Sequence, residues 1–189
     1  MLRITVKFKN YSYIYAHAPT EEKSERKKYQ FYERLYRMHK QCPSYDIKII
    51  LGNMNAKVGK EIWTGIAVGT CGLHDESYDY GTCLMNYAVH QRMVIGGTLF
   101  PHRNIHKGTL QGPDDRTINQ IDHIMIDQLH RSNLLDVRSY RGANADSGHY
   151  LVIARLKCHI AQRYKQKIPK DPLKYNKERL GINEVKQDC

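Results

Sequence analysis

The stretch Lys48-Ile-Ile-Leu-Gly-Asn-Met-Asn-Ala-Lys-Val-Gly59 says more about the fold than any other part of the sequence. Its apolar run at 49–51 ends at Gly52, a pattern typical of a buried β-strand. Asn53 and Asn55 follow, and on an extended backbone residues two apart face the same side. Two interpretations stay open here. Either a strand end delivers polar residues to a functional site, or these residues form an ordinary Asn/Gly turn.

Composition narrows the class of protein. The chain has 189 residues and a formal net charge of +11, so we expect a domain over 1–157 and a basic, mobile tail over 158–189. This charge favours nucleic acid, here DNA, as partner, although a charged tail that only aids solubility would also explain it. No apolar stretch has the length of a membrane span. The scattered cysteines favour an intracellular compartment, the nucleus if DNA is bound.

Hydrophobic periodicity predicts a mixed order of strands and helices. Residues 2–9 alternate between apolar and polar or basic side chains, which predicts a strand paired as a hairpin with a second strand over 11–16. A helix is expected from Glu21 to about Gln41, capped by Thr20. Further elements are predicted as a helix over about 82–92 and strands over 93–95, 120–127, 134–139 and 150–156, with loops over 57–79 and 96–117.

Polar residues cluster at or beside three of these strand ends. The clusters are Asn53 with Asn55, Asn119 with Asp122 and His123, and Asp146 with Ser147 and His149. Asp, Asn and His converging in this way suit phosphoryl chemistry with a divalent metal, because a carboxylate holds the metal and an amide positions the phosphate. The sequence contains neither a P-loop nor a Rossmann glycine motif, so it does not support a nucleotide cofactor.

In this order the clusters resemble motifs of the endonuclease/exonuclease/phosphatase family, above all the endonucleases of non-LTR retrotransposons and the craniofacial development protein 2-like proteins. The resemblance runs from about Leu2 to about Leu156. It rests on Ala18-Pro-Thr-Glu-Glu-Lys-Ser24, Ile49-Ile-Leu-Gly-Asn-Met-Asn-Ala-Lys-Val-Gly59, Val94-Ile-Gly-Gly-Thr-Leu-Phe-Pro-His102, Asn119-Gln-Ile-Asp-His-Ile-Met-Ile-Asp127, Leu135-Asp-Val-Arg-Ser-Tyr-Arg-Gly142 and Ser147-Gly-His-Tyr-Leu-Val152.

The resemblance implies an α/β (α+β) fold, a partial four-layer α/β/β/α sandwich that lacks its first strands. It also implies a phosphodiesterase that uses Mg²⁺ or Mn²⁺. Asn53 falls on the family's water-activating Asp, Asn55 on its phosphate-orienting Asn, and Asp122 on a catalytic Asp that is the candidate metal ligand. His149 falls on the terminal His, and His17 stands where an active-site Tyr is usual.

The departures from the family pattern predict lost chemistry. Asn53 cannot accept a proton as the family's Asp does. Gly148 replaces the carboxylate that would orient His149, and Asp146 is the candidate substitute. Leu110 stands where the family usually has Trp, and the sequence begins after the family's first metal-binding segment. Together these features predict a degenerate, inactive relative of a metal-dependent endonuclease, derived from a retrotransposon.

Three alternatives stay open. The chain could be a weakly active Mg²⁺-dependent endonuclease, a non-catalytic nucleic-acid-binding protein, or a translated remnant without a selected function. Strands missing from the sandwich would leave apolar sheet surface uncovered, so self-association is a further expectation.

Overall fold

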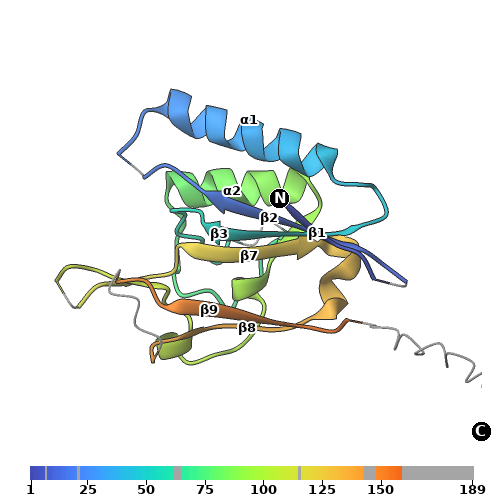
Figure 1. Cartoon of the computed structure of the whole chain (residues 1–189). Helices are drawn as coiled ribbons and strands as arrows, with labels where there is room; N and C mark the ends of the chain where they lie inside the picture. Colours follow the sequence, from blue (N-terminus) through green and yellow to red (C-terminus); the bar gives the residue numbers. More distant parts are fainter. Residues whose placement is uncertain (7, 21, 62–64, 115, 143–147, 159–189) are drawn as a thin grey trace, which may run out of the picture.

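The computed structural model describes residues 1–158 except for 7, 21, 62–64, 115 and 143–147 (Figure 1). The candidate residue Asp146 and the predicted tail beyond residue 158 lie outside the described residues. In chain order the elements are β1 (Leu2–Ile4), β2 (Tyr11–His17), α1 (Glu25–Gln41), β3 (Ile47–Asn53), α2 (Asp79–His90), β4 (Met93–Ile95), η2 (Gly96–Thr98), η3 (Asn104–His106), β5 (Leu110–Gln111), β6 (Ile118–Asn119), β7 (Asp122–Asp127), η4 (Gln128–Asn133), β8 (Leu134–Tyr140) and β9 (Leu151–Leu156).

The main sheet has five strands in the order β1-β2-β3-β7-β4. β2 and β3 are parallel, and the other neighbours are antiparallel. Alternate side chains point to opposite faces, so Ile50 and Met125 pack in one core while Ile49 and Ile126 pack in the other. The strand predicted over 120–127 is present as β7, and its side chains alternate between these two cores.

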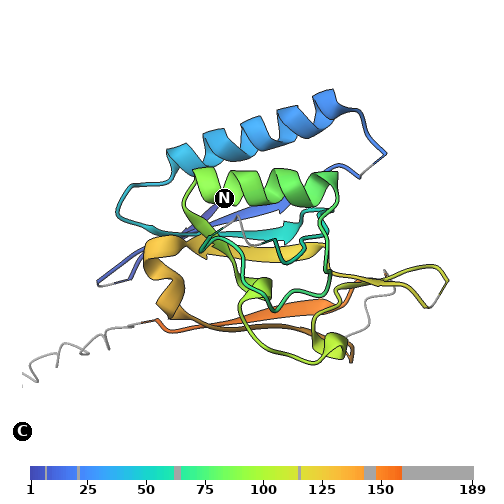
Figure 2. The same ribbon diagram turned by 180° about the vertical axis from the view of Figure 1, so that it is seen from behind.

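The molecule is built in layers (Figures 1 and 2). α1 and α2 cover one face of the main sheet, and the antiparallel pair β8–β9 covers the other. Within the described residues the second sheet has these two strands and no α-helix on its outer face. The predicted mixed α/β fold class is confirmed. None of the helices in the described part of the chain is long and apolar enough to cross a membrane.

The first strand is shorter than predicted. It ends at Ile4, and the Val6 N–H group then donates to Asn10 Oδ1 at 3.1 Å, which turns the chain away from the sheet. The predicted hairpin with β2 is present. Arg3 anchors this edge strand through two hydrogen bonds to Asp46, at 2.6 and 3.0 Å, and the Asp46 carboxylate is 1% exposed.

Both helices begin at positions other than those predicted. α1 begins at Glu25 because the Thr20 carbonyl accepts the Lys23 N–H group in a turn, and the Ser24 carbonyl accepts the first helical bonds. α2 begins earlier than predicted, at Asp79. Gly81 allows this, because an added Cβ there would lie 1.9 Å from the Lys57 carbonyl oxygen.

Candidate functional site

Three of the predicted site residues stand in a row at one end of the main sheet. His17 on β2 pairs in register with Asn53 on β3, and Asn53 pairs with Asp122 on β7. Registered neighbours share a face, and the alternation along each strand directs this row toward β8–β9. The candidate site therefore lies where β2 and β3 end and β7 begins.

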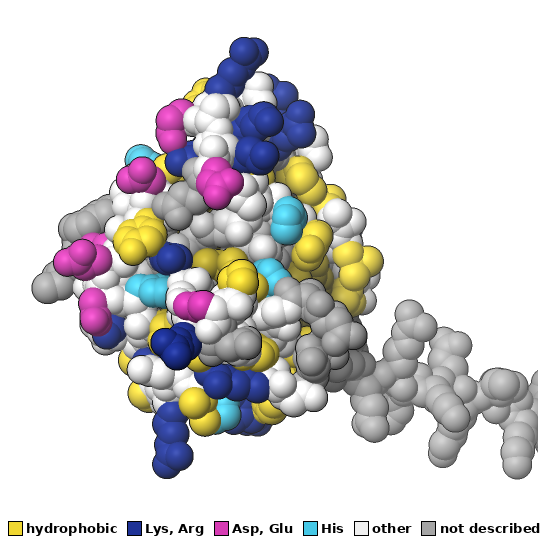
Figure 3. Space-filling model, turned by 90° about the vertical axis from the view of Figure 1, so that its left-hand side faces the viewer, with side chains coloured by type: hydrophobic (Ala, Val, Ile, Leu, Met, Phe, Trp, Pro, Cys, Tyr) yellow, Lys and Arg dark blue, Asp and Glu magenta, His cyan; other side chains and the backbone are white. Residues whose placement is uncertain are grey.

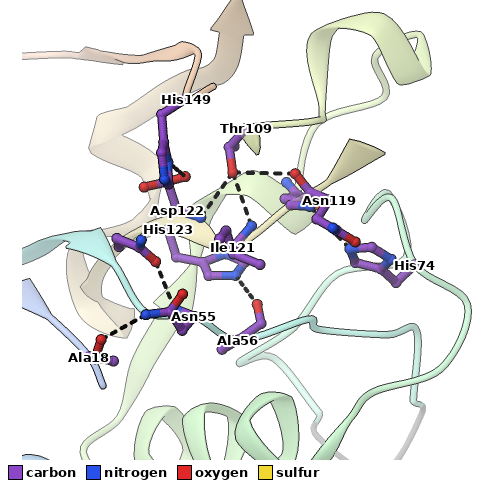
Figure 4. Close-up of polar contacts among 12 residues, drawn as sticks. Ala18, Asn55, Ala56, His74, Thr109, Asn119, Ile121, Asp122, His123 and His149 are labelled. Atoms are coloured by element: carbon purple, nitrogen blue, oxygen red, sulfur yellow. Dashed lines mark hydrogen bonds and ion pairs between the residues drawn. The ribbon is translucent and has the colours of Figure 1, made fainter. Parts of the chain in front are cut away.

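His149 joins the row through Asp122. It lies just before β9, and its Nδ1 is 3.0 Å from Asp122 Oδ2 (Figure 4). An isolated bridge to Leu110 holds its backbone beside the β5–β6 hairpin. Because Gly148 precedes His149, we expected the family's partner carboxylate to be lost, with Asp146 as its candidate substitute. Asp146 lies outside the described residues. Asp122 occupies the orienting role from another strand and favours the ring form with a proton on Nδ1.

Asn55 does not continue the strand. Its backbone has a φ of 46°, a left-handed conformation that Asn adopts more readily than most residues. Its N–H group donates to Asn53 Oδ1 at 2.8 Å, and its Nδ2 donates to the Ala18 carbonyl at 2.7 Å. The expectation that both side chains extend from one side of a strand is wrong, because β3 ends at Asn53 and the backbone at Asn55 is left-handed. The turn interpretation describes the local geometry.

Gly52 allows the row to form. Its φ is 138°, and an added Cβ would lie 2.0 Å from the Ala16 carbonyl oxygen. The ends of β2 and β3 therefore approach each other only because this position has no side chain.

Thr109 is a positioning residue that the sequence did not reveal. Its side chain is buried, and Oγ1 accepts the N–H groups of Ile121 and Asp122, both at 3.0 Å (Figure 4). Its backbone N–H donates to the Asn119 carbonyl at 2.7 Å, and its carbonyl accepts the Tyr150 N–H at 2.8 Å. Thr109 thus connects the start of β7 with the segment that carries His149. A threonine in a predicted loop gives no signal of this role.

The other histidines near the row have structural roles. His123 points to the helical face, where its Nε2 is 2.7 Å from the Ala56 carbonyl and burial lowers the pKa of the ring. His74 Nε2 accepts the Gln120 N–H group at 3.1 Å. Burial, with nearby Lys57, lowers the pKa of His74 to about 4. The ring is therefore neutral at neutral pH, as an acceptor must be.

The described residues do not form a divalent-metal site. Among them, no group of three or more His, Cys, Asp or Glu side chains could hold an ion. Asp122 is engaged by His149, and Asn53 offers a neutral amide whose oxygen already accepts a hydrogen bond. Mg²⁺ and Mn²⁺ favour several oxygen ligands with carboxylates among them, which this row does not supply.

Comparison with known sequences finds similarity to craniofacial development protein 2. The chain is 35% identical over 159 residues to that protein from Tragulus javanicus and 34% identical over 161 residues to that from Bos taurus. The aligned parts cover 84% and 83% of this chain, but only 27% of each relative's length. No protein-family model matches the sequence.

Solved structures show the same fold at low sequence identity. The endonuclease domain of TRAS1, a telomere-specific non-LTR retrotransposon, has a TM-score of 0.54 at 14% identity, over 83% of this chain and 62% of that one. The 3'-5' exonuclease NExo from Neisseria meningitidis has a TM-score of 0.57 at 15% identity, over 82% and 64%. An AP endonuclease from Archaeoglobus fulgidus has a TM-score of 0.52 at 19% identity, over 77% and 61%. The predicted resemblance is confirmed.

Proposed function

Because the chain is a nuclease-like relative with the endonuclease/exonuclease/phosphatase fold, we propose that it binds nucleic acid at the end of its main sheet without hydrolysing it. One observation carries the proposal. Within the row, an amide replaces the water-activating carboxylate, and the remaining carboxylate, Asp122, is paired with His149 at 3.0 Å. Loss of a general base alone costs about 10²- to 10⁴-fold in rate.

The row retains groups suited to holding a phosphodiester. Asn53 Oδ1 accepts the Asn55 N–H, so the side-chain NH₂ group is what Asn53 can offer a phosphate oxygen. His17 is exposed beside it, and the His149 side chain is 33% exposed. Lys107 and Asp122 both line a small pocket, to which Lys107 adds positive charge. These groups bind a phosphate by donation and by charge, and neither process requires a metal ion.

Nucleic acid is the partner best suited to this charge. The formal net charge is +11, and phosphate contacts by basic residues supply most non-specific affinity for DNA. On this end of the molecule, histidine side chains lie near the middle, with lysine and arginine above and below (Figure 3). The structurally similar phosphatase NExo has been solved bound to a product DNA hairpin. Likeness to the TRAS1 endonuclease domain supports derivation from a retrotransposon as part of the same proposal.

Weak hydrolysis is the second candidate, and the pairing of His149 with Asp122 favours it. A carboxylate-oriented imidazole is an established arrangement for a general base. On this alternative, supercoiled DNA is nicked slowly with Mg²⁺ or Mn²⁺, and Asp122→Ala abolishes nicking. The proposal instead predicts no nicking at protein concentrations that saturate the DNA.

Binding is tested by fluorescence anisotropy with two labelled duplexes of unrelated sequence over a range of salt concentrations. We expect similar affinities for both duplexes and a steep loss of affinity with salt. Lys107→Gln should weaken binding and lower the salt slope by about 1, because one phosphate contact is lost. Arg34→Gln, an equal charge change at an exposed position of α1 outside the row, is the matched control. Absence of binding, or equal losses in both variants, would contradict the proposal.

Restoring the missing carboxylate tests the explanation for inactivity. In Asn53→Asp the new carboxylate faces Asp122 across β3 and β7, and like charges directly opposite destabilise a sheet by roughly 0.2–1 kcal/mol. We expect Mn²⁺ to restore the free energy of unfolding of the variant, measured in urea, and to leave that of the original chain unchanged. An equal Mn²⁺ effect on both proteins would show that the amide at position 53 is not what weakens metal binding.

A further inference from the structure

A second polar pocket lies at the opposite end of the main sheet from the row. Its volume is about 920 Å³. The wall is formed by the C-terminal ends of α1 and α2, the start of β3 and the η4 segment, which meet on the right of Figure 1. Basic side chains from all four regions line it, namely Lys40, Lys48, Arg92 and Arg131, together with His39 and His130.

The positive charge of this pocket is not neutralised within the described part of the chain. There, no carboxylate forms an ion pair with Lys48, Arg92 or Arg131. Asp127 is the carboxylate among the described lining residues, and its Oδ2 accepts the backbone N–H of Lys48 at 2.8 Å. Asp127 is thus held by the start of β3, and among the described residues no ion pair joins it to Lys48, Arg92 or Arg131.

Helix dipoles explain only part of this charge. His39 and Lys40 lie in the last turn of α1, where cations stabilise the free carbonyl groups. Lys48 belongs to a strand, so no helix end accounts for it, and Arg131 lies in the last turn of the short 3-10 segment η4. Arg92 has a left-handed backbone with a φ of 52°, a conformation that non-glycine residues adopt rarely. The ends of α1 and α2 therefore do not account for all of the basic side chains in this pocket.

Histidines supply hydrogen-bonding groups to the same pocket. Burial lowers the pKa of both His39 and His130, so the rings are neutral at neutral pH and the permanent charge comes from lysine and arginine. Within the described residues His130 Nδ1 is buried without a hydrogen-bond partner, although Asp127 lies 3.9 Å away. A buried ring nitrogen of this kind is available to a ligand atom.

We propose that this pocket binds a small anion that carries two or more phosphate groups. Three cations without an ion pair among the described residues, together with a buried polar nitrogen, suit several phosphate oxygens at once. The volume lies within the roughly 300–1,000 Å³ range of small-molecule pockets. A nucleotide and an inorganic polyphosphate share this chemistry. The site is separate from the row proposed to contact DNA, so either proposal can fail alone.

Tripolyphosphate is the probe, and isothermal titration calorimetry measures its affinity and stoichiometry on the full chain. We expect one bound anion per chain and at least tenfold weaker binding by Lys48→Gln/Arg131→Gln. Arg26→Gln/Arg34→Gln removes the same charge from exposed positions of α1 outside the pocket and should leave binding unchanged. No binding, or equal losses in both double variants, would overturn the proposal.

Amide chemical shifts on the unsubstituted chain keep the test independent of variant folding. Addition of tripolyphosphate should move the amide signals of Lys48, Gln128 and Arg131. Movement mainly at Asn53 and Asp122 would overturn the assignment of this pocket. ATP that displaces tripolyphosphate would identify a nucleotide as the source, and no displacement by ATP would favour the inorganic anion. A single-stranded oligonucleotide is tested in the same way. If it displaces tripolyphosphate, and if Lys48→Gln/Arg131→Gln weakens its binding as well, the ligand of this pocket is nucleic acid and the small-anion proposal is overturned.

Discussion

Gly52→Ala should be among the most destabilising single-methyl additions in this chain. The new Cβ would lie 2.0 Å from the carbonyl oxygen of Ala16, 3.0 Å from its carbonyl carbon and 3.2 Å from its nitrogen. All three are backbone atoms of the neighbouring parallel strand, so no side chain can rotate aside. Relief requires β2 and β3 to separate at the end that carries His17 and Asn53.

The cost can be estimated in two parts. A φ of 138° is accessible to glycine and strains other residues by about 1–3 kcal/mol. Forcing a methyl group into occupied space adds roughly 1–3 kcal/mol more. Alanine recovers about 0.4–1 kcal/mol by restricting the unfolded chain. The free energy of unfolding should therefore fall by about 1–6 kcal/mol, a large share of a typical domain's stability.

Two other glycines separate these contributions. Gly65 has a φ of 59° with no described atom within 4 Å of an added Cβ, so Gly65→Ala reports backbone strain alone and should cost about 1 kcal/mol. Gly142 has neither a left-handed φ nor a described neighbour within 4 Å, so Gly142→Ala should be neutral or slightly stabilising. Urea unfolding followed by circular dichroism measures all three. If Gly52→Ala cost no more than Gly65→Ala, the inferred contact between β2 and β3 would be wrong.

Three further predictions concern groups that hold the sheet and the row. Arg3→Met should lower the free energy of unfolding, because the buried Asp46 carboxylate loses its charged partner. Urea unfolding measures this, and an unchanged free energy of unfolding would contradict the anchoring role of β1. Thr109→Val should cost about 1–3 kcal/mol and accelerate hydrogen exchange of the two N–H groups that Thr109 accepts; unchanged exchange would remove its positioning role. In the folded protein the pKa of His74 is about 4, below its value in the unfolded chain. The contribution of His74 to the free energy of unfolding is therefore complete above about pH 6.5. It decreases as the pH falls toward 4, by at most about 1.4 kcal/mol per pH unit. His74→Gln should flatten that part of the stability profile in urea unfolding at a series of pH values, and an unchanged profile would show that the buried acceptor for Gln120 is not the cause.

Much of the fold follows from local patterns. The apolar run at 49–51 and the alternation along 120–127 predicted two central strands, because residues that must be buried on one or both faces repeat with the period of a strand. Helix starts were misplaced because capping depends on which carbonyl the turn uses. Thr20 and Ser24 are both good caps by residue type, and only the folded backbone distinguishes them.

The candidate site was predictable in its residues but not in its contacts. His17, Asn53 and Asp122 were recognised from motifs, and their positions side by side depend on the register of three strands. The partner of His149 could not be found by reading the neighbouring letters, because Asp122 reaches it from a different strand. A hydrogen bond between distant residues leaves no local trace in a single sequence.

The amino-acid sequence alone was enough to predict the mixed α/β fold class, the basic character of the chain and the absence of a carboxylate at Asn53. These properties depend only on residue type and spacing, so they can be recognised without the folded structure. The tertiary structure decided that Asn55 turns, that Asp122 orients His149, and that a basic pocket forms at the far end of the sheet. Each of these depends on groups brought together by strand register and packing, which act between residues far apart in the chain.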